Sequence, residues 1–478
     1  MSSSDEITRK DAATITETLI VGGGASGLAA AWELARHGQA VTLLEQASQP
    51  GGNIRSLRED DWQIEIGPNT LMVKPPLYEL LRELDLDDEA IFAGEAGKKR
   101  YIAKGGRMHA LPTHPLQAPF NSLIGAASWL RILREPWVKP QAAHEETLAE
   151  FVERRLGRNI LDYLVDPFVS GVYAGDPHRL SVEAAMPRLH ALEREHGSLI
   201  RGGLATMRKA RRQAKEHPPA MPREWRGRLI SFADGIRTLT DRLAERIASA
   251  PHAVIHCERP VRQVTREEGR WQVTDAQGRH WQAERLVLAT PAHVSARLLA
   301  PVDPLLAEPL DEIVYPPVAS VALGFPPGLV AHPLDGFGVL IPRREKRRTL
   351  GALFSSTLFP GRAPAGHKLI TAFIGGRQDP EALEMNDAEL VRQVQNDLAD
   401  LLGIEGQPIW HRVNRWPEAI PQYELGHLAR MERLDRALEH HPGLSLIGNW
   451  RGGIAVGDCL ENGRALAEQI RSAARNGG

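Results

Sequence analysis

A glycine-rich turn near the N-terminus constrains the fold of this chain more than any other feature. Residues 19–21 form a short apolar strand, residues 22–27 read GGGASG, and a helical run extends from residue 28 to residue 37. Gly22 permits a tight turn, Gly24 lets the backbone approach a pyrophosphate, and Gly27 lets the helix pack closely on its strand. The helix N-terminus, with Ala25 and Ser26, then faces the phosphates. The pattern predicts the first unit of a dinucleotide-binding α/β domain.

A second strand and an acidic residue complete this unit. Residues 40–44 form a mostly apolar strand, and Glu45 follows it eighteen residues after Gly27. At that place a carboxylate accepts hydrogen bonds from a ribose diol. A glycine-rich loop without a ligand is the alternative for an isolated motif, and the flanking strands, helix and acid argue against it.

The residues after Glu45 indicate FAD rather than NAD. Residues 46–56, QASQPGGNIRS, form a second small-residue loop beside the same pyrophosphate. This loop resembles the extension in flavoproteins of the amine oxidase and phytoene desaturase superfamily, although an arginine stands near position 46 in most of that group. The candidate cofactor contacts in this loop are Gln46, Gly51, Gly52, Asn53 and Arg55.

Two later segments also point to FAD. Residues 254–290 read as a meander of four strands, VIHC, Val261 to Thr265, WQVTD and WQAERLVLATP, inserted in the dinucleotide domain. We expect Val261 against the adenine and the end of the last strand near the cofactor. At the C-terminus the strand LSLIGN precedes three glycines and a helix whose dipole can face a flavin carbonyl. The candidates from these segments are Val261, Ala289, Thr290, Gly453, Ile454 and Val456.

Composition excludes several other functions. The 478 residues carry a formal charge of −2, which provides no general attraction for a polyanion, so nucleic acid is not expected as a partner. Cys257 and Cys459 provide neither a disulfide framework nor a metal-binding spacing, which favours a reducing compartment and no metal. We expect no secretory or transit peptide and no spanning helix, hence a cytoplasmic protein, soluble or peripheral at the inner face of a membrane.

Longer blocks of sequence resemble one family, the oxygen-dependent, FAD-containing protoporphyrinogen oxidases. The most specific block is DPFVSGVYAGDP at residues 166–177 with its continuation to residue 201. Similar blocks are GPNTL at 67–71, KKRYIAKGG at 98–106, LGALFSSTLFPGRAP at 350–364 and RGGIAVGDC at 451–459. The resemblance covers nearly the whole chain from residue 17.

The resemblance implies roles for individual residues. Arg100 would hold a substrate propionate, and the carbonyl of Gly171 would face the pyrrole nitrogens. Leu340 and Leu353 would sandwich one ring, and Phe373 would stack on another. The segment of Gly67, Pro68 and Asn69 would lie near the flavin, with Asn69 as the candidate catalytic residue. Without the resemblance, these leucines read as strand core and Arg100 as a solvated strand end.

The expected architecture is an α/β fold of three parts. The first is a discontinuous Rossmann-type FAD domain, residues 15–90, 228–300 and 440–478. The second is a mixed-sheet substrate-binding domain, residues 91–110 and 301–439, and the third is a mainly helical lobe, residues 111–227. Within that lobe, residues 121–138 predict one helix with an apolar stripe. The stripe suits either a protein core or, as the resemblance implies, contact with a membrane.

The predicted reaction is oxidation of protoporphyrinogen IX to protoporphyrin IX in haem biosynthesis, with oxygen as acceptor. Six electrons leave the substrate and FAD takes two per cycle, so three cycles are needed, each releasing hydrogen peroxide. No hydrolase or zinc motif is present. The alternatives are a coproporphyrinogen III oxidase, an amine or carotenoid oxidase, and a non-catalytic flavin-fold escort protein. Hand-off of the product to ferrochelatase is a further possible partnership.

Overall fold

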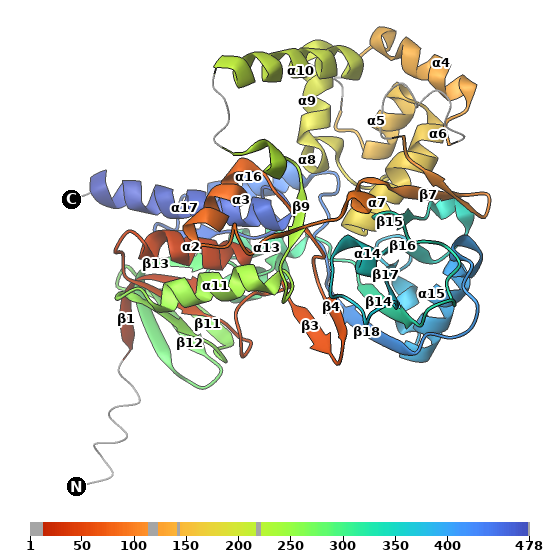
Figure 1. The fold of residues 1–478 in the computed structure, drawn as a ribbon. Helices are drawn as coiled ribbons and strands as arrows, with labels where there is room; N and C mark the ends of the chain where they lie inside the picture. The colour runs from red at the N-terminus through yellow and green to blue at the C-terminus, as the bar shows by residue number, and fades with distance from the viewer. Residues whose placement is uncertain (1–12, 113–122, 141–143, 217–220, 477–478) are drawn as a thin grey trace.

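A computed structural model describes residues 13–112, 123–140, 144–216 and 221–476 (Figure 1). Its first large sheet has the strand order β10-β2-β1-β13-β12-β11, and β19 pairs with β13 as a seventh strand. The strands are β1 (Thr14–Val21), β2 (Val41–Leu44), β10 (Ala253–His256), β11 (Val261–Glu267), β12 (Arg270–Asp275), β13 (His280–Leu288) and β19 (Leu444–Leu446). Strands β10, β2, β1, β13 and β19 pair in parallel, whereas β11 and β12 extend the sheet in antiparallel fashion.

Helices cover both faces of this sheet because its parallel strands are apolar on both sides. The helices α2 (Ala25–Ala35), α11 (Arg237–Ala248) and α17 (Val456–Asn476) pack on one face. The helices α12 (Ala292–Leu299), α13 (Pro304–Asp311) and α16 (His427–Leu438) contribute to the core on the other. This is the mixed α/β architecture expected from the glycine-rich turn.

One expectation about this sheet is wrong. The segment VIHC lies in β10, which pairs in parallel with β2 and is not a strand of the antiparallel meander. It follows α11, and a helix between strands brings the chain back to a sheet edge in the parallel direction. The meander therefore consists of β11, β12 and β13, and β13 also continues the parallel sheet beside β1.

The second large sheet has the order β18-β14-β17-β16-β15-β7-β8. Its strands are β7 (Tyr101–Lys104), β8 (Arg107–Ala110), β14 (Val318–Phe325), β15 (Gly338–Leu340), β16 (Thr349–Leu353), β17 (Lys368–Gly375) and β18 (Trp410–Trp416). The apolar side chains of the amphipathic helix α15 (Asp387–Leu402) pack against one face of this sheet. They form one hydrophobic core with strand residues such as Val321, Val339 and Ala372. The opposite face is turned toward the other parts of the molecule.

Short elements connect the two sheets. The hairpin of β3 (Ser56–Glu59) and β4 (Trp62–Glu65) packs Trp62 and Ile64 against Ala322 and Leu369 of the second sheet. A small sheet joins β5 (Leu71–Met72), β9 (Leu229–Ser231) and β6 (Ile91–Phe92), and α3 (Pro75–Glu83) follows β5. These elements hold the two large sheets beside one another (Figure 1).

A helical lobe lies above the sheets in Figure 1. Its longer helices are α4 (Ala126–Arg134), α5 (Leu148–Arg155), α7 (Asp166–Tyr173), α9 (Pro187–His196) and α10 (Leu199–Glu216). A buried network joins α5 and the turn after α4 to the start of α10, because Glu135 accepts from Arg155 at 2.9 Å, from the Ser198 hydroxyl at 2.6 Å and from the Leu199 N–H at 2.8 Å. Glu135 thus caps the start of α10 with a buried and fully partnered carboxylate.

The expected single helix over residues 121–138 is wrong. Helix α4 ends at Arg134 and a 3₁₀ turn spans Glu135–Trp137, because Pro136 has no N–H and cannot continue the helical hydrogen bonds. Leu123 precedes the helix and is buried, whereas Leu130, Leu133 and Trp137 are exposed. Residues 121 and 122 lie outside the described residues. The apolar stripe of α4 is therefore not a core stripe.

Among the described residues, no helix combines the length and the apolar character needed to cross a bilayer. Within the same ranges, His, Cys, Asp and Glu side chains form no group of three or more that could hold a metal ion.

Candidate functional site

The glycine-rich turn lies between the end of β1 and the start of α2. Gly22 has φ +106°, which favours glycine, and a Cβ at Gly27 would stand 2.0 Å from the Gly22 carbonyl oxygen. A Cβ at Gly24, in contrast, would meet no protein atom within 4 Å. The backbone of the turn is thus tightly packed at Gly27, whereas the space next to Gly24 contains no protein atoms. A pyrophosphate requires such a space beside the backbone.

Glu45 is buried at the end of β2 and faces this turn. Its Oε2 accepts from the Gly23 N–H at 2.7 Å, and its Oε1 accepts from the Ala47 N–H at 2.8 Å. The Arg259 N–H bonds to the Glu45 carbonyl at 2.8 Å, which brings the start of β11, and so Val261, to the same edge. The carboxylate is therefore positioned by backbone donors beside the turn.

The second small-residue loop lies against the first. The Gly51 N–H donates to the Gly23 carbonyl at 2.7 Å, and a Cβ at Gly52 would stand 3.0 Å from the Gly24 Cα. Arg55 donates to the Gly52 carbonyl at 3.0 Å. Gln46, Asn53 and Arg55 are exposed, so their side chains remain accessible.

The GPN segment joins this cluster from β4. A Cβ at Gly67 would stand 1.9 Å from the Asn53 carbonyl oxygen, so the two segments touch through their backbones. The Asn69 amide donates to the Gly67 carbonyl at 3.0 Å, and Pro68 between them is half-buried. These contacts hold Asn69 close to the second small-residue loop.

The C-terminal glycines are held by Tyr423. The Gly453 N–H donates to the Tyr423 hydroxyl at 3.0 Å, and that hydroxyl donates to the Asn449 carbonyl at 2.8 Å. Burial raises the pKa of Tyr423, which keeps the hydroxyl protonated. Tyr423 was not predicted from the sequence, since a lone tyrosine carries no motif.

The ends of β13 and β19 meet the same region. The Ala289 N–H donates to the Val21 carbonyl at 2.8 Å, and the buried Thr290 shares a hydrogen bond with Ser295 at 2.7 Å. Ile454 is half-buried, and Val456 begins α17. A Cβ at Gly463 in α17 would stand 2.3 Å from the Ser26 carbonyl, so α17 packs directly on α2.

These residues fit an extended dinucleotide such as FAD. A Cβ at Gly27, Gly52 or Gly67 would stand 3.0 Å or less from a backbone atom of a neighbouring segment. A Cβ at Gly24 would meet no protein atom within 4 Å, which leaves room for the cofactor. Two helix N-termini, those of α2 and α17, border this space. Gly24 and Glu45 lie where a phosphate and a ribose would be held.

The second sheet carries the predicted substrate residues on one face. Leu340 pairs with Gly351, and Gly351 pairs with Phe373, so Leu340 and Phe373 belong to one row across three strands. Leu353 pairs with Gly338 in the next row of the same face, because residues two apart on a strand point the same way. All three side chains are half-buried, and α15 covers the other face.

Arg100 directly precedes β7 and lies on the same face of the sheet. Val339 pairs with Tyr101, so Arg100 lies one residue before this pair, level with the row of Leu353. The Arg100 guanidinium stands 5.5 Å from the centroid of the Phe337 ring. Its side chain is exposed and available to a carboxylate.

Helix α7 covers this face from the helical lobe. A Cβ at Gly171 would stand 2.4 Å from the Leu340 Cδ2, so the backbone of α7 comes directly against the sheet. Phe168 and Val172, one turn apart on α7, are 41% and 47% exposed. Apolar side chains left open beside Gly171 suit a flat apolar ligand.

A buried pair between Glu65 and Arg362 was also missed by the sequence analysis. Arg362 Nη2 lies 3.2 Å from Glu65 Oε1 and donates to the Ser231 hydroxyl at 2.6 Å. Burial raises the pKa of Glu65 and lowers that of Arg362, which are the directions expected for charges removed from water. The pair joins the segment between β16 and β17 to the last residue of β4, two residues before Gly67. The block PGRAP contained Arg362, but no local signal indicated its partner.

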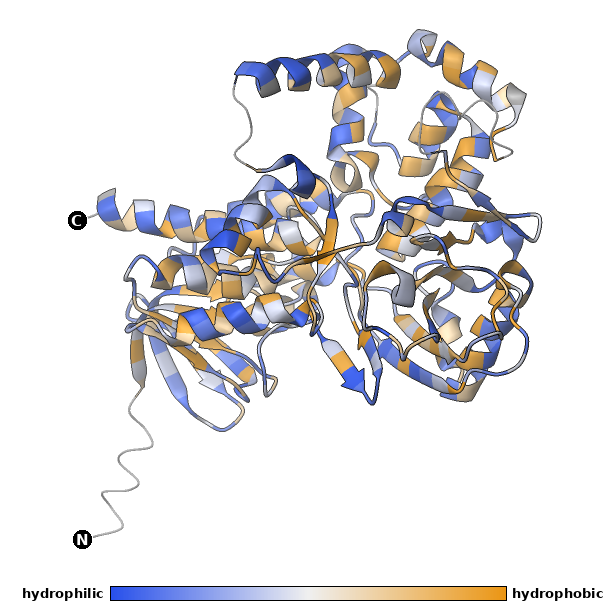
Figure 2. Ribbon diagram, in the orientation of Figure 1, coloured by the Kyte–Doolittle hydropathy of each residue, from blue (hydrophilic) through white to orange (hydrophobic). Residues whose placement is uncertain are grey.

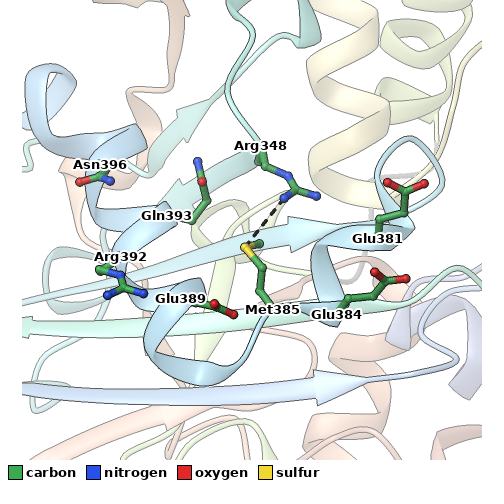
Figure 3. A pocket seen from close by; sticks show the side chains of 8 residues that line it. All are labelled: Arg348, Glu381, Glu384, Met385, Glu389, Arg392, Gln393 and Asn396. Carbon is green, nitrogen blue, oxygen red and sulfur yellow. Dashed lines mark hydrogen bonds between the residues drawn. The ribbon is translucent and has the colours of Figure 1, made fainter.

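A separate hollow of about 540 Å³ lies beside α15, on the side of the second sheet that α15 covers (Figure 3). Arg348 donates to Met385 Sδ at 3.8 Å there, and acidic side chains such as Glu381 and Glu389 line its walls. It contains none of the predicted substrate residues.

Comparisons with known proteins show which family this chain is similar to. The model of the family described as flavin containing amine oxidoreductase matches residues 25–471. Protoporphyrinogen oxidase 2, chloroplastic/mitochondrial, of Arabidopsis thaliana is 33% identical over 95% of this chain and 93% of its own length. Coproporphyrinogen III oxidase of Bacillus subtilis is 27% identical over 94% of this chain and 96% of its own.

A solved structure shows the same fold. The crystal structure of a candidate protoporphyrinogen oxidase from Exiguobacterium sp. 255-15 has a TM-score of 0.79 and 25% identity, and covers 96% of this chain and 99% of that one. The chain belongs to the family of flavin-containing amine oxidoreductases. Its cofactor is FAD.

Proposed function

We propose that this chain oxidises protoporphyrinogen IX to protoporphyrin IX in haem biosynthesis, with oxygen as the electron acceptor. The observation that carries the proposal is the common sheet face of Arg100, Leu340, Leu353 and Phe373, covered by Gly171 of α7. The similarity to a plant protoporphyrinogen oxidase over 95% of the chain supports the same substrate class.

The chain's own residues orient the substrate. FAD, when bound, supplies the redox chemistry, accepting two of the six electrons in each of three cycles. Leu340, Leu353 and Phe373 hold the macrocycle flat by burial of apolar area, and the Gly171 carbonyl faces the pyrrole N–H groups as an acceptor. Arg100 holds a propionate through a charge-assisted hydrogen bond. Orientation and exclusion of water are the main contributions of such a site.

In this proposal the first sheet belongs to the part that binds FAD, and the second sheet belongs to the part that binds the substrate. Residues 15–90, 228–300 and 440–478 form the FAD-binding domain in this proposal, and the glycine loops and Glu45 hold the dinucleotide. Residues 91–110 and 301–439 form the substrate-binding domain, and residues 111–227 form the helical lobe. Asn69, close to the second small-residue loop, faces the cofactor in this proposal.

Coproporphyrinogen III is the second candidate substrate, favoured by the similarity to the Bacillus subtilis enzyme. The two porphyrinogens differ at two substituents, which are vinyl groups in one and propionates in the other. The experiment compares kcat/KM for both under air, by porphyrin fluorescence. A clear preference for coproporphyrinogen III would overturn the proposed substrate, and absence of turnover with either would favour an escort protein.

We also propose that the helical lobe rests on the inner face of a membrane, so that the chain is a peripheral membrane protein. Leu130, Leu133 and Trp137 on α4 and its 3₁₀ turn are exposed, as are Leu204 and Met207 on α10. Figure 2 shows hydrophobic and hydrophilic residues mixed along both helices, which lie together along the outer edge of the lobe. The exposed cationic residues of α10 are Arg201, Arg208, Lys209, Arg211, Arg212 and Lys215. Apolar side chains beside basic ones suit the boundary of an anionic lipid surface.

A further inference from the structure

The start of α17 holds a carboxylate next to the flavin-facing glycines. Asp458 is the third residue of this 21-residue helix. Its Oδ2 lies so close to Gly453 that a Cβ at Gly453 would stand 2.6 Å from it. Gly453 has φ +126° and carries no side chain that could separate the carboxylate from the loop. A negative charge therefore lies beside the segment that we place against the flavin.

The groups around Asp458 are mostly neutral. Burial, and then the charge of Asp458, raise the pKa of Tyr173, and burial raises that of Cys459 to about 11. Tyr423, whose hydroxyl accepts from Gly453, also has a raised pKa through burial. All three side chains stay protonated at neutral pH, so none of them offsets the carboxylate.

Lys74 supplies a positive charge at this point. Its Nζ lies 2.7 Å from Asp458 Oδ1, and the two residues are 384 positions apart in the sequence. Lys74 follows Asn69 by five residues and directly precedes α3, whose N-terminus its side chain does not cap. The ion pair thus joins the Asn69 segment to the start of α17, two segments that we place beside the flavin.

We infer that Lys74 is a positioning residue for the redox reaction, which offsets the charge of Asp458 beside the flavin. The inference rests on the proposed placement of FAD. Reduction adds negative charge to the cofactor, and an uncompensated carboxylate nearby opposes that charge. Lys74 thereby makes the bound flavin easier to reduce, in addition to holding the two segments together.

The experiment measures the two-electron reduction potential of the purified holoenzyme by dye-coupled titration. Lys74→Met should shift the equilibrium toward oxidised flavin by about tenfold, which is about 30 mV more negative for a two-electron couple. Lys74→Arg should keep the wild-type potential. Lys98→Met is the matched control, because Lys98 forms an ion pair with Glu95 at 2.6 Å on the exposed surface.

Charge compensation and simple structural support give different results in a double variant. Lys74→Met combined with Asp458→Asn should return the potential to the wild-type value, because the carboxylate that needed compensation is gone. An unchanged potential in Lys74→Met, or a double variant as negative as the single one, would overturn the inference.

If the Lys74→Met variant does not retain flavin, the reduction potential of the Asp458→Asn variant tests the inference by itself. Its potential should be more positive than that of the wild type, and an unchanged value contradicts the inference. The readout involves no porphyrinogen, so a wrong substrate assignment would show in the turnover assay and leave this measurement unaffected.

Discussion

Gly171 on α7 lies against Leu340 on β15 with no room for a side chain between them. A Cβ at position 171 would stand 2.4 Å from the Leu340 Cδ2. Leu340 shares its row of the sheet with Phe373, so a change at residue 171 is transmitted to the proposed substrate face. This contact joins the helical lobe to the second sheet at the centre of the site.

Gly171→Ala should therefore impair substrate binding more than folding. The Leu340 side chain can rotate away at a cost of about 1 kcal/mol, but its new position intrudes on the macrocycle. We expect a KM for protoporphyrinogen raised about tenfold and a small loss of stability. Gly203→Ala in α10 is the control, since nothing lies within 4 Å of its Cβ and kinetics should not change. A wild-type KM in Gly171→Ala would remove Gly171 from the site.

Gly24→Val should separate cofactor binding from folding. No protein atom lies within 4 Å of the new Cβ, so the apoprotein should fold, but the space for the pyrophosphate is filled and flavin should be absent. Gly27→Ala, whose Cβ meets the Gly22 carbonyl at 2.0 Å, should lower the Tm even without flavin. Absorbance of the purified proteins and thermal unfolding measure the two effects. A yellow, folded Gly24→Val protein contradicts the proposed placement.

Arg100→Ala should raise KM more than it lowers kcat. The lost charge-assisted contact to a propionate costs about 1.5 to 3 kcal/mol, or about ten- to a hundredfold in kcat/KM. The propionate is remote from the carbon that is oxidised, so the contact acts alike in the ground and transition states. Arg107→Ala is the control, because Arg107 is also exposed and lies on the other strand of the same hairpin. Unchanged KM in Arg100→Ala would exclude the propionate role.

Combined Leu133→Glu and Trp137→Glu should abolish binding to phosphatidylserine vesicles in a flotation assay. These side chains are 64% and 76% exposed, and burying one of them in lipid contributes about 1.5 to 3 kcal/mol, so the partition should fall at least about tenfold. Ile409→Glu is the matched control, since Ile409 is 61% exposed near the second sheet. Equal flotation of both variants would contradict a membrane surface on the helical lobe.

His427 should make stability depend on pH between about 4 and 6.5. Burial lowers the pKa of this histidine, which stacks on Tyr423 with ring centroids 4.2 Å apart, to about 4. As pH falls below 6.5 the unfolded chain binds a proton that the folded chain does not, so stability is lost until pH reaches about 4. Between pH 7 and pH 5 the wild type should lose about 2 kcal/mol more than His427→Gln, measured by urea unfolding. Parallel pH profiles would show that His427 does not titrate in this range.

Local patterns in the sequence were sufficient for the dinucleotide unit. The glycine spacing, the apolar strands and Glu45 lie within about thirty residues, and so do the close approach of Gly27 to the Gly22 carbonyl and the hydrogen bond from the Gly22 N–H to the Leu44 carbonyl. The C-terminal strand and helix were likewise predicted, because turns and periodicity are encoded locally. The resemblance to one family supplied the candidate substrate residues, which periodicity alone would have assigned to strand cores.

Only the tertiary structure decided how distant segments meet. The parallel pairing of β10 with β2 and the early end of α4 before Pro136 depart from the sequence-based expectation, and the exposure of Leu133 and Trp137 decides against the core alternative for their stripe. The partners of Lys74, Tyr423 and Arg362 are remote in the sequence or lie in other parts of the fold, and single polar residues carry no spacing that identifies a partner. Local sequence determines turns, strands and helices, whereas the packing of the two sheets and the helical lobe determines which of their side chains come together.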